Sequence, residues 1–132
     1  MGATAFQRGL GAMHALSHPL GALYDAHHGL LNAIVMPYVL IANEREITDV
    51  LARLGSYLGL ANAGFSGVVD HILRLRERLG IPHRLADIGI DDADAELVGQ
   101  MAVVDPTAAT NPIPFSQQQY SELFTRAVDG QV

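Results

Sequence analysis

The chain has 132 residues and a formal net charge of −6, a size that suits one domain with a single core. Its eight cationic side chains are all Arg, and this acidic balance speaks against a nucleic-acid partner and against binding to anionic membrane surfaces. The absence of Lys excludes a phosphate-loop or Schiff-base lysine, and the absence of Cys, with no secretory signal, leads us to expect a cytoplasmic protein without disulfides.

Residues 1–43 have the composition of a protein interior. Arg8 and Asp25 are their only charged residues, and all other charged residues follow from Glu44 onward. A helix that is apolar on all sides is a buried helix, so this segment is expected either at the centre of the domain or against a partner. We expect Pro19 to divide the segment into two helices.

From residue 44 onward, apolar periodicity and capping residues predict four amphipathic helices and no strand. The predicted helices cover residues 43–55, 66–79, 93–104 and 116–127. Asn43 with Glu46, and Ser116 with Gln119, have the spacing of a capping box. The stretch 106–114 is predicted to be a loop. The sequence therefore predicts a single all-α domain over residues 1–132, a bundle of about six helices.

Four of the six histidines fall in the apolar first third, at His14, His18, His27 and His28. His14 and His18 are four residues apart and share one face of a helix, and a second helix after Pro19 can bring His28 back to His14. Neutral imidazole is a common nitrogen ligand for divalent metals, although a metal site usually needs three or four ligands. The alternative is that one or two of these side chains are core histidines bonded to backbone carbonyls.

One long motif lies in this region: residues 11–21 read GAMHALSHPLG, residues 28–33 read HGLLNA, and residues 36–39 read MPYV. It resembles the signature of the iron-containing (group III) alcohol dehydrogenases. The agreement continues at LGIP, LADIGI and Asn111-Pro112. The resemblance therefore covers essentially the whole chain, corresponds to about the last third of a family member, and implies the helical C-terminal domain of that family.

The resemblance also implies a site for a divalent metal, Fe²⁺ or sometimes Zn²⁺, that polarises the alcohol oxygen while hydride passes to NAD(P). In the family an aspartate and three histidines hold this metal between a nucleotide-binding domain and the helical domain. His14 and His28 match the last two of these histidines, His18 matches a histidine near the nicotinamide and the substrate, and His27 falls at a variable position. The family's other two ligands and its NAD(P)-binding domain lie upstream and are not in this sequence.

Two function hypotheses follow from these observations. The first is the C-terminal, metal-binding part of an iron-dependent, NAD(P)-linked alcohol dehydrogenase, which acts on an alcohol or aldehyde. Because two ligands instead of four should bind metal weakly, we expect it to be inactive alone. The second is a non-catalytic, self-associating helical module derived from the same family. A third reading, ranked below both, lets His14, His18 and His28 form a metal site of their own.

We expect the chain to associate either with a nucleotide-binding domain or with a second copy of itself. The apolar surface of residues 1–43 would need cover, and the simplest cover is a two-fold dimer with Leu31 and Ile34 at its interface. The substrate does not follow from the sequence. Tyr24, Phe6 and Leu10 are candidates to line its pocket.

Overall fold

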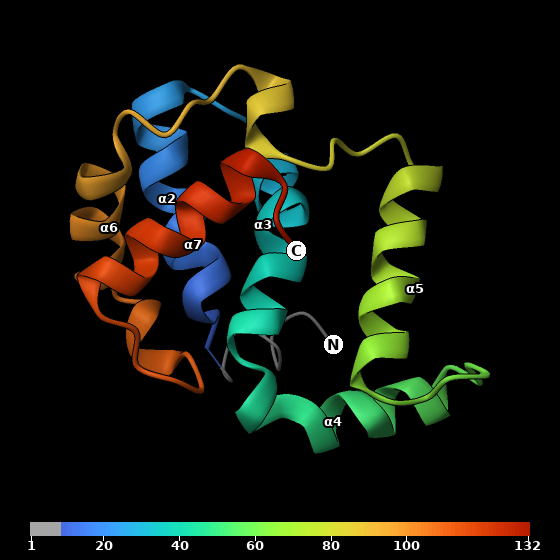
Figure 1. Cartoon of the computed structure of the whole chain (residues 1–132). Coiled ribbons are helices and arrows are strands. Elements are labelled where there is room, and N and C mark those ends of the chain that lie inside the picture. The colour runs from blue at the N-terminus through green and yellow to red at the C-terminus, as the bar shows by residue number, and fades with distance from the viewer. Residues whose placement is uncertain (1–8) are drawn as a thin grey trace.

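The computed structural model describes residues 9–132, and this part of the chain contains six α-helices, two short 3₁₀ helices and no strand. In chain order the elements are α2 (Gly11–Tyr24), α3 (His28–Ala42), α4 (Glu44–Tyr57), α5 (Phe65–Arg78), η1 (Leu85–Ile88), α6 (Ala95–Val103), η2 (Ala108–Thr110) and α7 (Gln117–Asp129). Helices α2, α3, α6 and α7 pack together, and α4 and α5 extend on the side away from α6 (Figure 1). The predicted all-α class is confirmed, and the predicted loop 106–114 contains the short η2 turn.

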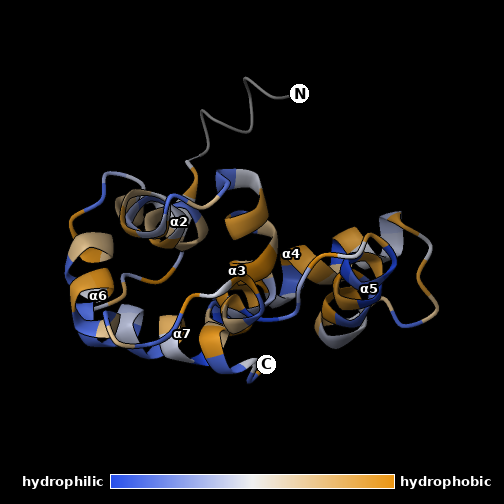
Figure 2. Ribbon diagram, turned by 90° about the horizontal axis from the view of Figure 1, so that it is seen from above, coloured by the Kyte–Doolittle hydropathy of each residue, from blue (hydrophilic) through white to orange (hydrophobic). Residues whose placement is uncertain are grey.

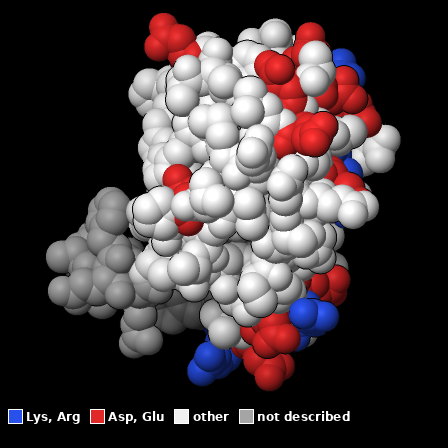
Figure 3. Space-filling model, turned by 90° about the vertical axis from the view of Figure 1, so that its left-hand side faces the viewer, with Lys and Arg blue, Asp and Glu red and all other residues white. Residues whose placement is uncertain are grey.

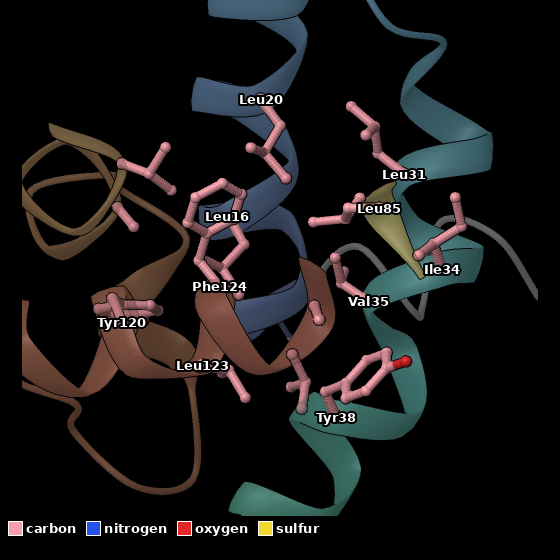
Figure 4. Packing of buried hydrophobic residues seen from close by; sticks show 14 of the residues in the cluster. Leu16, Leu20, Leu31, Ile34, Val35, Tyr38, Leu85, Tyr120, Leu123 and Phe124 are labelled. Carbon is pink, nitrogen blue, oxygen red and sulfur yellow. The ribbon is translucent and has the colours of Figure 1, made fainter. Parts of the chain in front are cut away.

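The core lies where α2, α3, α7 and η1 meet (Figure 4). Its large, fully buried side chains include Leu16 and Leu20 of α2, Leu31, Ile34 and Val35 of α3, Leu85 of η1, and Tyr120 and Phe124 of α7. Full burial of an aliphatic or aromatic side chain stabilises the fold by about 1.5–3 kcal/mol. Packing of these elements therefore fixes the position of α2 against α3.

The expected dimer face is not available at Leu31 and Ile34. Both side chains are 0% exposed within a single chain, because α3 packs against α2, α5 and α7. Our expectation that they lie at an interface between subunits is therefore wrong. The low charge of residues 11–42 follows from the central position of α2 and α3 in the fold.

Helix α2 continues through Pro19, and the predicted break at this residue is wrong. The chain turns instead at Asp25, which has a left-handed backbone with φ 51°, and the N–H of Asp25 donates to the carbonyl of Gly21 at 3.1 Å. A proline inside a helix costs about 3 kcal/mol. Burial of Leu16 and Leu20 on either side of it offsets that cost, so α2 carries its histidines on one continuous helix.

Of the two predicted capping boxes, one forms and one does not. The hydroxyl of Ser116 accepts from the N–H of Gln119 at 3.2 Å, and the N–H of Ser116 donates to the side-chain oxygen of Gln119 at 2.9 Å. The Asn43 side chain makes no cap bond to α4. Its Oδ1 atom, the group that a cap would use, accepts instead from Nδ2 of Asn111 at 2.8 Å, and its Nδ2 atom donates to the carbonyl of Val39 at 3.0 Å.

The outer helices α4 and α5 each have a hydrophilic and a hydrophobic side (Figure 2). On the face next to α6, Asp and Glu gather toward the edges of a wide area without charge (Figure 3). Within residues 9–132, no helix combines the length and the hydropathy that crossing a bilayer requires.

Candidate functional site

Three histidine rings from α2 and α3 lie against one another. His14 and His18 are one turn apart on α2, and His28 is the first residue of α3. The ring centroids are 5.1 Å apart for His14 and His28, 5.3 Å for His18 and His28, and 6.0 Å for His14 and His18. The structure thus brings together the three residues identified from the sequence. Their roles as metal ligands and as a neighbour of the nicotinamide stay predictions.

His27 lies outside this cluster. It is the N-cap residue of α3, and its Nδ1 atom accepts a hydrogen bond from the N–H of Leu30 at 3.3 Å. This bond turns its ring toward its own helix. The group of four histidines seen in the sequence therefore separates into a cluster of three and one cap.

Asn32, one turn after His28 on α3, connects two of the rings. Its Nδ2 atom lies 3.3 Å from Nε2 of His14 and 3.0 Å from Nε2 of His28. An amide nitrogen carries two hydrogens and no acceptor lone pair, so it donates one hydrogen to each ring, and both Nε2 atoms accept. Two imidazole lone pairs therefore point at one position between the helices. Sequence reasoning gave Asn32 no role, although its spacing of four residues from His28 is a usable signal.

His14 is favoured in its neutral form. Burial lowers the pKa of this half-buried side chain below its ordinary value, and the neighbouring His28 ring lowers the pKa further. A neutral ring is also the form in which histidine binds a metal.

Asp105 holds the third ring from the segment after α6. Its Oδ2 atom lies 2.8 Å from Nδ1 of His18, and its Oδ1 atom accepts from the N–H and the hydroxyl of Thr107 at 2.8 and 2.6 Å. Burial acts to raise the pKa of Asp105, but the hydrogen bonds from Thr107 and His18 outweigh it and hold the pKa below its ordinary value. Sequence reasoning used Asp105 only as a helix end, because no local pattern indicates a contact across 87 residues.

Tyr24 and Leu10, two of the residues expected to line a substrate pocket, are not brought together. The Tyr24 hydroxyl donates to Asp94 at 3.0 Å, and burial together with this bond raises the pKa of Tyr24 to about 12. Leu10 lines a mainly apolar cavity of about 450 Å³ between the start of α2, the end of α3 and α4, and Tyr24 is not part of its wall. Phe6 lies outside the described residues.

The two convergent nitrogens belong to His14 and His28, the residues that the sequence predicts as metal ligands. Within residues 9–132, no three His, Cys, Asp or Glu side chains are arranged to hold a metal ion. The imidazoles of His14 and His28 fit the ligand preferences of Fe²⁺ and Zn²⁺, and the Asn32 amide lies at the point where their lone pairs meet. A complete site needs further ligands in addition to this pair.

The chain matches one family along nearly its whole length. Residues 1–128 match the model described as the Fe-containing alcohol dehydrogenase family, C-terminal. The chain is 36% identical to the 1,3-propanediol dehydrogenase of Citrobacter freundii over 124 residues, which cover 89% of this chain and 32% of that protein. It is also 36% identical to the 4-hydroxybutyrate dehydrogenase of Cupriavidus necator over 136 residues, which cover 96% of this chain and 35% of the relative. The chain thus spans about a third of the length of these relatives.

Solved structures agree with these sequence matches. The crystal structure of a 1,3-propanediol oxidoreductase superposes with a TM-score of 0.84 at 31% identity, covering 89% of this chain and 32% of the other. The iron-containing alcohol dehydrogenase from Thermococcus thioreducens superposes with a TM-score of 0.81 at 26% identity, covering 92% of this chain and 32% of the other. The chain therefore belongs to the iron-containing alcohol dehydrogenase family, of which it represents the helical C-terminal domain.

Proposed function

We propose that this chain is the metal-binding part of an NAD(P)-linked alcohol dehydrogenase, with His14 and His28 as two of the metal ligands. The observation that supports this most directly is the convergence of their Nε2 atoms on the Asn32 amide, at 3.3 and 3.0 Å. The lowered pKa of His14 favours the neutral ring that a metal requires. When bound, Fe²⁺ or Zn²⁺ supplies a Lewis acid that polarises the oxygen of an alcohol or aldehyde.

In this proposal each histidine has a separate task. His14 and His28 hold the metal from the side of the helical domain, and the remaining ligands and NAD(P) come from a nucleotide-binding domain. His18 stacks on His28 with an angle of 16° between the rings, and its side chain is 43% exposed. An accessible imidazole beside the metal position can accept a hydrogen bond from a substrate hydroxyl.

The proposed substrate class is an alcohol or the corresponding aldehyde. Two relatives are named for 1,3-propanediol and for 4-hydroxybutyrate, and both names describe dehydrogenases. Because hydride transfer also needs a bound nicotinamide cofactor, we propose that the helical chain is inactive alone.

Zinc titration of the full chain by calorimetry tests the proposed ligands. We expect His14→Ala and His28→Ala each to weaken zinc binding by at least about tenfold, because each removes one of two nitrogen donors. His71→Ala, on the distant helix α5, is the matched control and should leave the affinity unchanged. Zinc binding that is equally tight in His14→Ala, His28→Ala and the unsubstituted chain would contradict the proposal.

A gain-of-function variant gives a second test of the same geometry. Asn32→Asp replaces the amide with a carboxylate at the position where the lone pairs of His14 and His28 meet, and it thereby adds a third ligand. We expect it to tighten zinc binding by at least about tenfold, whereas Asn32→Ala should not. No gain in Asn32→Asp would show that the two nitrogens do not converge on a usable position.

The need for a nucleotide-binding domain is tested with the cofactors. Adding NAD⁺ or NADP⁺ to the chain should leave its melting temperature unchanged, because a ligand that does not bind cannot shift unfolding. A clear rise with either cofactor would contradict this. Co-expression with the nucleotide-binding part of a relative, followed by assays with a panel of alcohols, then tests the complete activity.

A further inference from the structure

Asp105 and His18 form a hydrogen bond whose donor and acceptor can be assigned from the structure. We propose that Asp105 is a positioning residue, which fixes His18 in the tautomer that carries its proton on Nδ1. The significance of this inference for catalysis rests on the proposed function. Its test needs neither metal, nor cofactor, nor turnover.

The Asp105 carboxylate is fixed from behind. Its Oδ1 atom accepts from the N–H of Thr107 at 2.8 Å and from the hydroxyl of Thr107 at 2.6 Å. These two bonds leave Oδ2 facing Nδ1 of His18 at 2.8 Å, and only 12% of the Asp105 side chain is exposed. Thr107 thus sets the direction in which Asp105 points.

This geometry determines where the imidazole proton lies. An ionised carboxylate can only accept hydrogen bonds, and the lowered pKa of Asp105 keeps it ionised. The Nδ1 atom of His18 must therefore carry the hydrogen, which leaves an unshared lone pair on Nε2 of the neutral ring. The proton is held on the buried side of the ring.

The neighbouring ring of His28 also constrains His18. His18 stacks on His28 with their centroids 5.3 Å apart and an angle of 16° between the rings. The stacking therefore fixes the plane of the His18 ring, and the bond to Asp105 fixes the rotation of the ring within that plane. Its side chain is 43% exposed, against 12% for Asp105. His18 therefore presents a hydrogen-bond acceptor of fixed direction next to the proposed metal position, suited to a hydroxyl group of an alcohol substrate or of a cofactor ribose.

The variant Asp105→Asn separates positioning from simple packing, since it keeps the size of the side chain. The N–H of Thr107 can only donate, so the amide oxygen of the new Asn must face Thr107, and the amide nitrogen must face His18. Facing a donor, Nδ1 of His18 has to become an acceptor, and the proton has to move to Nε2. Asp105→Asn is thus expected to reverse the tautomer while the ring stays in place.

Nitrogen-15 NMR of the histidine-labelled, metal-free chain measures this directly, because protonated and unprotonated ring nitrogens have well separated resonances. At about pH 9, where histidine side chains are neutral, we expect His18 to be protonated on Nδ1 in the unsubstituted chain. In Asp105→Asn we expect protonation on Nε2. The spectrum of His18→Gln assigns the signals, and Asp94→Asn, which removes the carboxylate bonded to Tyr24, is the control that should leave His18 unchanged.

The outcomes are distinguishable. A His18 protonated on Nε2 in the unsubstituted chain would overturn the inference without the need for any variant to fold. Retention of the Nδ1 proton in a folded Asp105→Asn would overturn it as well. Zinc binding that is equally tight in His14→Ala, His28→Ala and the unsubstituted chain would contradict the proposed function and leave this measurement valid.

Discussion

Asn43 and Asn111, which lie 68 residues apart, hold each other through two hydrogen bonds between their side-chain amides, at 3.0 and 2.8 Å. The Asn111 oxygen also accepts from the backbone N–H of Ala12 at 3.1 Å, and the hydroxyl of Thr110 accepts from the N–H of Gly11 at 3.2 Å. The residue before α2 makes no side-chain cap bond. The helix that carries His14 is therefore capped by the segment that precedes α7.

Asn111→Ala is expected to lower the free energy of unfolding by about 2–3 kcal/mol, because it removes the partner of Asn43 and a cap of α2 at once. Urea unfolding measures the change. Gln100→Ala, an exposed site on α6, is the control and should stay within about 0.5 kcal/mol of the unsubstituted chain. Equal stability of the two variants would contradict the role of Asn111.

Helices α6 and α7 approach each other closely at Gly99. A Cβ atom at this position would meet the hydroxyl of Ser121 and lie 2.6 Å from the carbonyl of Gln117. Gly99→Ala should therefore destabilise the chain by about 1–3 kcal/mol. In Gly21→Ala the nearest atom, the carbonyl of Ala26, is 3.8 Å away, so this helical site should gain about 0.5–1 kcal/mol. Thermal unfolding that changes in the same direction in both variants would refute this difference.

Two buried tyrosine hydroxyls should respond differently to removal. The hydroxyl of Tyr38 donates to the carbonyl of His83 at 2.7 Å, whereas the hydroxyl of Tyr120 has no hydrogen-bond partner among the described residues. We expect Tyr38→Phe to lower the free energy of unfolding by about 1 kcal/mol, and Tyr120→Phe to leave it unchanged or raise it by about 1 kcal/mol. Urea unfolding at neutral pH separates the two.

The pH dependence of stability gives an independent check on Tyr120. Burial, together with the charge of Asp105, raises the pKa of Tyr120 from 10.0 to about 12. The unfolded chain then loses this proton at lower pH than the folded chain, so stability falls as the pH rises from about 10 to about 12. Tyr120→Phe should make that fall smaller. An identical alkaline profile for both proteins would argue against the raised pKa.

Self-association remains a proposal. Because Leu31 and Ile34 are buried, the exposed apolar side chains of α4 are the better place to test it. Val50, Leu54 and Tyr57 of α4 are 51%, 43% and 88% exposed and form an apolar stripe at helical spacing. We expect light scattering to find a dimer and Leu54→Glu to give a monomer. Leu31→Asp should unfold the chain, since Leu31 is 0% exposed in the core. A 14.1 kDa particle at every concentration would contradict self-association.

Features that involve only residues close to one another in the sequence could be predicted from the sequence. The Ser116–Gln119 box involves only the first turn of α7, and the pairing of His14 with His18 needs only the helical repeat. The place of His28 beside them was expected from a second helix after a break at Pro19, but that break does not form. The turn that brings it there occurs at Asp25, a non-glycine residue with positive φ, which no local pattern marked.

The parts that could not be predicted depend on partners distant in sequence. Asn43 has the spacing of a helix cap, but its side-chain oxygen accepts from Asn111, and this competing partner is visible only in three dimensions. Asp105 reaches His18 for the same reason. Local spacing thus identifies which histidines can act together, and tertiary packing decides how each ring is oriented.

The capping of α2 by residues near the other end of the chain also governs when the site can form during synthesis. Isolated helices of 14 residues are only marginally stable in water, and α2 in addition contains Pro19 and has no side-chain cap of its own. The partners of its first turn, Thr110 and Asn111, follow 99 residues later, and the partner of His18 follows 87 residues later. The first turn of α2 and the ring of His18 therefore acquire their partners only after residue 111 has been synthesised, so the order of synthesis places the cluster late in folding.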